Sequence, residues 1–119
     1  MREYRIELEI VEGHGGQLRA DGSRPDFANE GICAWMYGCY QAGQRFAYPQ
    51  DMGKLCPWLF DSLQGMIHVL RFGGTLGWLY EGTPYKKEIN PKGVTTEFVR
   101  CPDPASGIVV KLIRTAIED

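Results

Sequence analysis

The sequence lacks a long apolar run, and this absence excludes one class of structure. No stretch approaches the roughly 18 consecutive apolar residues that a membrane-spanning helix requires. The N-terminus leads almost directly into a strand pattern, so a signal peptide is not expected either. We therefore predict a cytoplasmic protein that does not use a membrane as a partner.

An excess of positive charge is also missing. Lys and Arg number 13 against 15 Asp and Glu, which gives a formal net charge of −2 at pH 7. A protein that binds nucleic acid by neutralising phosphates needs a basic face, and this composition argues against one. Lys86, Lys87 and Lys92 form a small basic cluster, and their polar, Gly- and Pro-punctuated surroundings predict a solvated loop. Nucleic acid is therefore not expected as a partner.

Cysteine is sparse, and its spacing matches no standard metal-binding motif. The chain has four cysteines and no Cys-x-x-Cys pair. In a cytoplasmic protein we expect reduced thiols rather than disulfides. Cys56 and Cys101 each precede a proline at the end of a predicted element, and they are the candidate pair for a thiolate metal site or a redox site. Burial as small hydrophobic residues is the competing interpretation.

The chain does contain one segment with a complete set of helix signals, residues 57–72. Pro57 suits the first helical position, where its missing N–H is no loss. Gly73 and Gly74 supply a left-handed stop. Between these signals, apolar residues recur at helical spacing, and polar residues occupy the opposite face. The apolar stripe consists of Leu59, Leu63, Met66, Ile67 and Leu70.

Alternating or β-branched stretches predict strands on both sides of this helix. The last two strands are separated by the turn-forming stretch 102–106, which predicts a hairpin. The predicted strands are residues 4–11, 45–48, 94–101 and 107–114. Further expectations are a strand over residues 36–41, a short strand over 75–80 and a short helix capped by Asp26.

These elements predict a single domain, residues 1–119, of the α+β class. The strand signals are one-sided, so an antiparallel or mixed sheet packed by one main helix is expected. The alternative is a small, partly closed β-barrel with the helix as a plug. In the first arrangement, the helix stripe packs against apolar strand residues, namely Ile6, Leu8, Ile10, Ile108, Val110 and Leu112.

Five short motifs follow one another along the chain. They are the turn Gly43 to Phe46, the helix start Cys56-Pro57-Trp58, the pair Gly73-Gly74, the stretch Cys101 to Pro104, and the last strand from Val109 to Arg114. As a set, together with the first strand, they resemble a family of small uncharacterised prokaryotic proteins. The resemblance covers the first strand and most of the chain from about residue 30 onward. It implies no activity, because the family has none to carry over.

The function expected first is that of a small-ligand-binding or accessory module with a pocket between helix and sheet. The candidate ligand-binding residues are Trp58, Asp61, His68 and Trp78. Asp61 and His68 share one face of the predicted helix and could line one pocket, and the two tryptophans lie near the helix ends, where they could wall it. The alternatives are a thiolate metal or redox protein that uses Cys56 and Cys101, and a small enzyme that uses His68 as acid or base. Catalytic residues and cofactors are not assigned.

Self-association is a further expectation. The domain is small, it is rich in aromatic residues, and at least one strand is expected at a sheet edge. Each of these features favours the burial of additional surface. A homodimer is therefore predicted.

Overall fold

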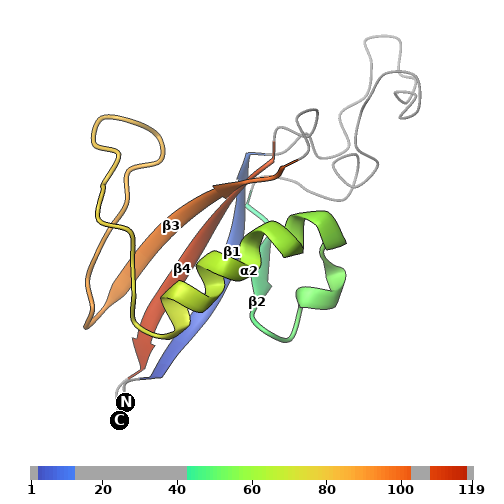
Figure 1. Ribbon diagram of the computed structural model, residues 1–119, viewed down its shortest axis with the longest axis horizontal. Helices are drawn as coiled ribbons and strands as arrows, with labels where there is room; N and C mark the ends of the chain where they lie inside the picture. The colour runs from blue at the N-terminus through green and yellow to red at the C-terminus, as the bar shows by residue number, and fades with distance from the viewer. Residues whose placement is uncertain (1–2, 13–42, 103–107, 118–119) are drawn as a thin grey trace.

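The computed structural model describes residues 3–12, 43–102 and 108–117, which form a helix packed on an open sheet. The sheet has four strands in the order β2-β1-β4-β3, and every pairing is antiparallel. Helix α2 crosses one face of it (Figure 1). The α+β prediction is confirmed in its antiparallel form. The barrel alternative is wrong, because β2 and β3 end the sheet on opposite sides. The elements are β1 (Glu3–Glu12), β2 (Arg45–Ala47), the 3-10 turn η1 (Met52–Lys54), α2 (Pro57–Arg71), β3 (Val94–Arg100) and β4 (Val109–Ile117).

The two central strands come from the two ends of the described chain. Glu3 lies opposite Ile117, and the pairing continues to Ile10 opposite Val110. The predicted last strand was placed at residues 107–114, whereas β4 starts at Val109 and extends to Ile117. Strand β4 continues to Ile117 because β1 offers backbone hydrogen-bond partners that far. This pairing with a distant strand cannot be seen in the sequence pattern of β4 itself.

Helix α2 begins and ends as its sequence signals predict. Pro57 is its first residue, and Gly73 beyond its end has a φ of 85°. A left-handed residue at this place lets the chain turn away while the last helical carbonyls keep donors. The amide of Gly74 donates to Val69 O at 2.9 Å. No helix in the described part of the chain has both the length and the apolar character to cross a membrane.

The core lies between α2 and the sheet, as the sequence predicted. Every apolar residue named for the helix stripe is buried except Met66, which is half-buried at the margin. One cluster unites these residues with the apolar side chains of β1 and β4. Its central members are Ile6, Leu8, Ile10, Leu59, Leu63, Ile67, Leu70, Ile108, Val110 and Leu112.

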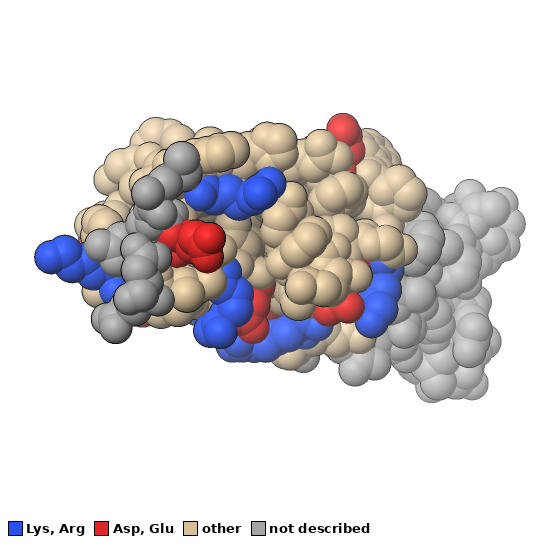
Figure 2. All heavy atoms as spheres, turned by 90° about the horizontal axis from the view of Figure 1, so that it is seen from below, with Lys and Arg blue, Asp and Glu red and all other residues tan. Residues whose placement is uncertain are grey.

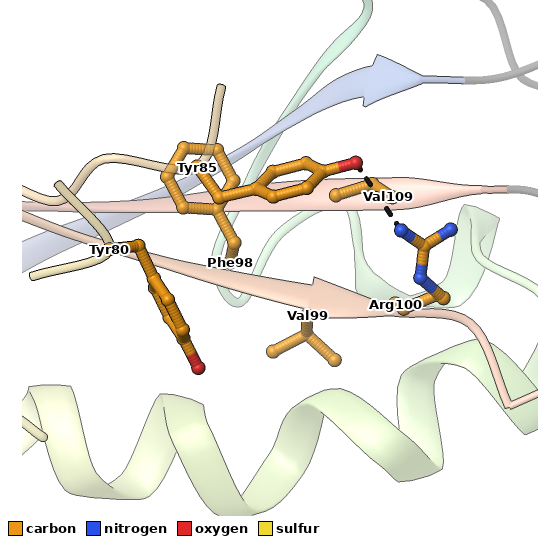
Figure 3. Close-up of a pocket in the computed structure, with 6 residues that line it drawn as sticks. All are labelled: Tyr80, Tyr85, Phe98, Val99, Arg100 and Val109. Carbon is orange, nitrogen blue, oxygen red and sulfur yellow. Dashed lines mark hydrogen bonds between the residues drawn. The ribbon is translucent and has the colours of Figure 1, made fainter. Parts of the chain in front are cut away.

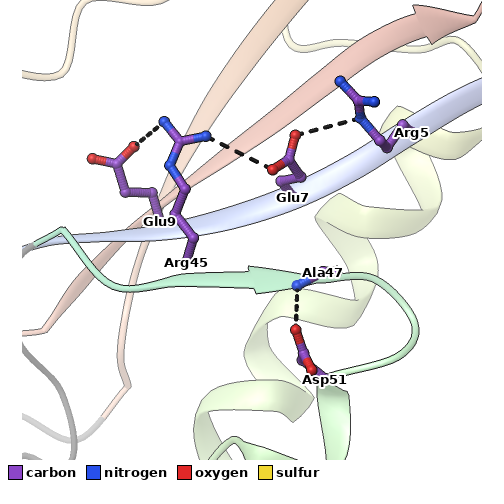
Figure 4. Close-up of polar contacts among 6 residues, drawn as sticks. All are labelled: Arg5, Glu7, Glu9, Arg45, Ala47 and Asp51. Carbon is purple, nitrogen blue, oxygen red and sulfur yellow. Dashed lines mark hydrogen bonds and ion pairs between the residues drawn. The ribbon is translucent and has the colours of Figure 1, made fainter.

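The opposite face of the sheet is charged, and no helix from the described residues packs on it. Arg45 pairs with Glu9 at 2.9 Å and with Glu7 at 3.7 Å, and Arg5 pairs with Glu7 at 3.4 Å (Figure 4). These pairs are partly solvated and therefore contribute little to stability. In the view of Figure 2, Lys and Arg lie beside Asp and Glu, and neither sign gathers into a large patch.

Both edges of the sheet are partly closed by hydrogen bonds. At β2, the Ala47 amide donates to Asp51 Oδ2 at 2.9 Å, and the Asp51 amide donates to Ala47 O at 2.9 Å (Figure 4). At β3, the Thr96 amide donates to Glu88 O at 2.9 Å. These contacts occupy backbone groups that an edge strand would otherwise offer to another chain.

Some sequence predictions differ from the structure, and others lie outside its described residues. Residues 75–80 form no strand, because the Leu76 amide donates to the Glu97 carboxylate instead and Tyr80 has a left-handed backbone. Lys87 is buried, so the prediction of a solvated basic loop is wrong at this position. The strand predicted at 36–41 and the helix capped by Asp26 lie outside the described residues.

Candidate functional site

A pocket of about 240 Å³ lies at the β3 edge of the sheet, and we call it the β3-edge pocket. Because side chains alternate along a strand, β3 contributes to it from both faces. Val99 points towards α2, whereas the Phe98 ring lies with Tyr85 on the other side of the strand (Figure 3). The lining residues are Tyr80, Tyr85, Phe98, Val99, Arg100 and Val109.

Tyr85 organises the polar rim of the β3-edge pocket. Its ring meets Phe98 edge to face, with centroids 5.6 Å apart. Its hydroxyl donates to Glu12 Oε2 at 2.6 Å and accepts from Arg100 Nη2 at 3.3 Å (Figure 3). None of the ion pairs between described residues involves Arg100. An exposed guanidinium is therefore held by a neutral hydroxyl among the aromatic residues that line the pocket.

A buried ion pair lies beside this pocket, on the α2 face of the sheet. Lys87 Nζ is 2.7 Å from Glu97 Oε1, and each side chain is 1% exposed. The other carboxylate oxygen, Glu97 Oε2, accepts from Thr75 Oγ1 at 2.9 Å and from the Leu76 amide at 3.2 Å. The pair thus fastens the segment that follows α2 to the inner face of β3.

Two aromatic rings cover the ammonium group of this pair. Lys87 Nζ lies 5.1 Å from the ring centroid of Trp78 and 5.0 Å from that of Tyr80, which is within the range of cation–π attraction. Tyr80 has a φ of 53°, a conformation that a bulky residue adopts only under constraint from its surroundings. Its ring also lines the β3-edge pocket, so Tyr80 belongs to both features.

The residues predicted to bind a ligand are not brought together. Trp58, Asp61 and His68 are all exposed along α2, and Trp78 lies over Lys87 in the following segment. None of these four residues lines the β3-edge pocket, and the interface between α2 and the sheet is filled by the core. A ligand-binding role for these residues, or an enzymatic role for His68, stays a prediction.

The two candidate thiols differ in their surroundings. Cys56 is the N-cap residue of α2 and is half-buried, whereas Cys101 is buried in the core cluster. Among the residues that the structure describes, no three His, Cys, Asp or Glu side chains are grouped to hold a metal ion. Structural zinc takes four ligands, so these two thiols could supply only half a set. Their metal or redox role also stays a prediction.

A second pocket, of about 380 Å³, lies where β1 and β2 meet at the opposite edge of the sheet. Its charged residues, Arg5 and Glu7, already pair with each other. Tyr48 forms part of its wall and accepts a hydrogen bond from Arg71 Nη1 at 3.3 Å. Because its charges are internally compensated, this pocket is a weaker candidate for an ionic ligand than the β3-edge pocket.

Sequence reasoning missed the residues that build the site, although part of the signal was present. Glu97 lies two positions from Val99, and Arg114 lies two positions from Leu112, so the members of each pair share a face of the sheet. A known hairpin register would therefore have placed Glu97 and Arg114 on the face that α2 covers. Tyr80 and Tyr85 belong to an irregular segment, where no periodicity reports on side-chain direction.

Comparisons with protein-family models, with curated proteins and with solved structures gave no match to this chain. The family resemblance of the five short motifs therefore stays a prediction.

Proposed function

We propose that this protein binds a small organic anion with an aromatic or apolar body in the β3-edge pocket. One observation carries the proposal: an exposed arginine lines a pocket whose other lining residues are aromatic and aliphatic. Ligand sites commonly combine a mostly apolar wall with a few polar groups that fix orientation. The proposal keeps the expected class, a small-ligand-binding module, and moves the site from the helix to the sheet edge.

The chemistry of the rim favours a carboxylate over a neutral group. A guanidinium offers several N–H donors in one plane, which match the two oxygens of a carboxylate. Arg100 is oriented by the hydroxyl of Tyr85, a neutral group, and it forms no direct ion pair with another described residue. Tyr85 is in turn fixed by Glu12 and by the edge-to-face contact with Phe98, so the donor is oriented before a ligand arrives.

The test uses benzoate, which combines one ring with one carboxylate, and benzyl alcohol as its neutral counterpart. We expect benzoate to shift the NMR signals of Tyr85, Phe98 and Arg100 and to bind more tightly than benzyl alcohol. Arg100→Gln should weaken benzoate binding about tenfold, because a charged hydrogen bond contributes about 1.5–3 kcal/mol and part of this is recovered by water.

Arg45→Gln is the matched control, since Arg45 is also an arginine at the sheet surface but lies in β2 at the opposite edge. It should leave benzoate affinity unchanged. Equal affinity for the acid and the alcohol, or signal shifts confined to residues away from β3, would contradict the proposal.

A further inference from the structure

Lys87 is a primary amine held almost entirely out of water, with one ionic partner among the residues that the structure describes. Its ammonium is 2.7 Å from Glu97 Oε1 and has no geometrically good hydrogen bond to a described residue. An ammonium has three N–H donors. Besides Glu97, the rings of Trp78 and Tyr80 stabilise its charge, but only through weaker cation–π attraction. A purely structural lysine would be better served by further acceptors or by water.

The two carboxylate oxygens of Glu97 contact different groups. Oε2 is occupied by Thr75 Oγ1 and the Leu76 amide, and these contacts orient the carboxylate. Oε1 faces Lys87 Nζ. A carboxylate oxygen 2.7 Å from the amine nitrogen is close enough to take and return the amine's proton once the two groups align.

Tyr80 separates this amine from the β3-edge pocket. The centroid of its ring is 5.0 Å from Lys87 Nζ, and the same residue lines the pocket. It is 47% exposed, so its ring has room to turn towards solvent. A ligand in the pocket is therefore one aromatic side chain away from a buried nucleophile.

From these three features we infer that Lys87 forms an imine with a small aldehyde or ketone that enters through the β3-edge pocket. The inference rests on the proposed function and narrows its ligand class to carbonyl compounds that also carry an anionic group. The anionic group binds Arg100, and the carbonyl carbon reaches Lys87 when the Tyr80 ring moves aside.

The reaction balances within the Lys87–Glu97 pair. Glu97 takes a proton from the ammonium, and the freed Nζ lone pair forms the C–N bond while the carbonyl π electrons move to oxygen. Glu97 returns its proton to that oxygen, accepts one from the new nitrogen, and delivers it to the hydroxyl, which leaves as water. The product is a protonated imine beside the Glu97 carboxylate. Since one cation replaces another next to the same anion, the pair stabilises the imine as it stabilised the ammonium.

The experiment incubates the intact protein with 4-formylbenzoate and sodium cyanoborohydride, which reduces a protonated imine to a stable amine. Peptide mapping by mass spectrometry then gives the labelling rate of each lysine. Lys86 and Lys92 are the internal controls, because they lie in the same segment and are exposed. We expect Lys87 to be labelled about tenfold faster than either control, which is less than the roughly 10²–10⁴-fold that a positioned proton-transfer group supplies, because burial slows the entry of the aldehyde. Labelling of Lys87 at the rate of the exposed lysines, or more slowly, would overturn the inference.

Two variants separate a reactive pair from simple accessibility. Glu97→Gln removes the base and should reduce Lys87 labelling to the control rate, whereas Tyr80→Ala opens the route and should raise it. Wild-type labelling decides the question even if a variant fails to fold. Benzoate binding without preferential Lys87 labelling refutes this inference and leaves the proposed function standing. Preferential labelling without benzoate binding supports the reactive amine and contradicts the anion site.

Discussion

Arg114 shows how this small domain uses a long cationic side chain in its interior. Its Nη1 donates to Leu70 O at 3.0 Å and to Gly74 O at 2.7 Å, and the guanidinium carbon lies 4.4 Å from the Tyr4 ring centroid. Burial lowers the pKa of the Arg114 guanidinium, while Tyr4 opposes that shift. The positive charge sits at the C-terminus of α2, where the helix dipole is negative.

The first prediction at the residue scale concerns this arginine. Arg114→Met should lower the free energy of unfolding by about 2–4 kcal/mol, because two helix-terminal carbonyls lose a charged donor in a buried place. Urea denaturation measures the loss. Arg5→Met is the control at an exposed position and should change stability by less than about 0.5 kcal/mol. A similar small change for Arg114→Met would show that water replaces its hydrogen bonds.

The second prediction at this scale concerns the two described cysteines. Cys56 should react with iodoacetamide faster than Cys101, because it lies at a helix N-terminus and is half-buried, whereas Cys101 is 6% exposed in the core. Mass spectrometry of the native protein at several reaction times gives both rates. If Cys101 reacts as fast as Cys56, the helix terminus and the difference in burial have no effect on reactivity.

At the scale of elements, the sequence predicted the core-facing side correctly wherever the apolar spacing within one helix or strand is enough to identify it. The alternation in β1 and the stripe of α2 identified the core face of each, and the predicted hairpin of β3 and β4 is confirmed. The pattern failed where the answer depended on a distant partner. Lys87 lies in an irregular segment and Glu97 in the edge strand β3. From the sequence each looks like a surface residue, because neither pattern shows that the two side chains meet.

The helix offers a direct test of that core assignment. Leu63→Ala should cost about 2–5 kcal/mol of unfolding free energy, since Leu63 is fully buried and its removal leaves a cavity between α2 and the sheet. Gln64→Ala, one position along on the exposed face, is the matched control and should stay within about 0.5 kcal/mol. Urea midpoints for both variants give the comparison, and equal midpoints would mean that the stripe is not core.

The closure of the β2 edge predicts a pH dependence. The hydrogen bond from the Ala47 amide, followed by that from Lys54, lowers the pKa of Asp51 below its ordinary value of 3.8. A carboxyl whose pKa is lower in the folded state stabilises the fold above its unfolded pKa, and this contribution is lost as pH falls through the folded pKa.

Asp51→Asn should therefore lower the thermal midpoint at neutral pH, and the difference from wild type should shrink as pH falls below about 4. Asp61→Asn is the control, because Asp61 lies exposed on α2. A difference that stays constant from neutral to acidic pH would show that the carboxylate charge plays no part in closing the edge.

At the scale of the whole molecule, the exposed aromatic residues bear on self-association. Phe72 is 71% exposed and Trp78 is 55% exposed, and both lie at or after the end of α2. The hydrogen bonds at both sheet edges disfavour pairing through strands, so the predicted homodimer would have to use this aromatic surface instead. Light scattering at high micromolar concentration tests the prediction. A monomer mass refutes the homodimer, and a dimer that Trp78→Ser converts to monomer places the interface.

The pairing of β1 with β4 has a consequence for the speed of folding. Glu3 meets Ile117, so the two central strands join only after the chain has closed nearly its whole described length into a loop. The β3–β4 hairpin, by contrast, joins neighbours in sequence and can form early. Contacts of such long range slow folding, because the entropy of closure is lost before the core compensates for it. On a ribosome, β1 and α2 would have to wait for β4 to emerge before the sheet acquires its middle.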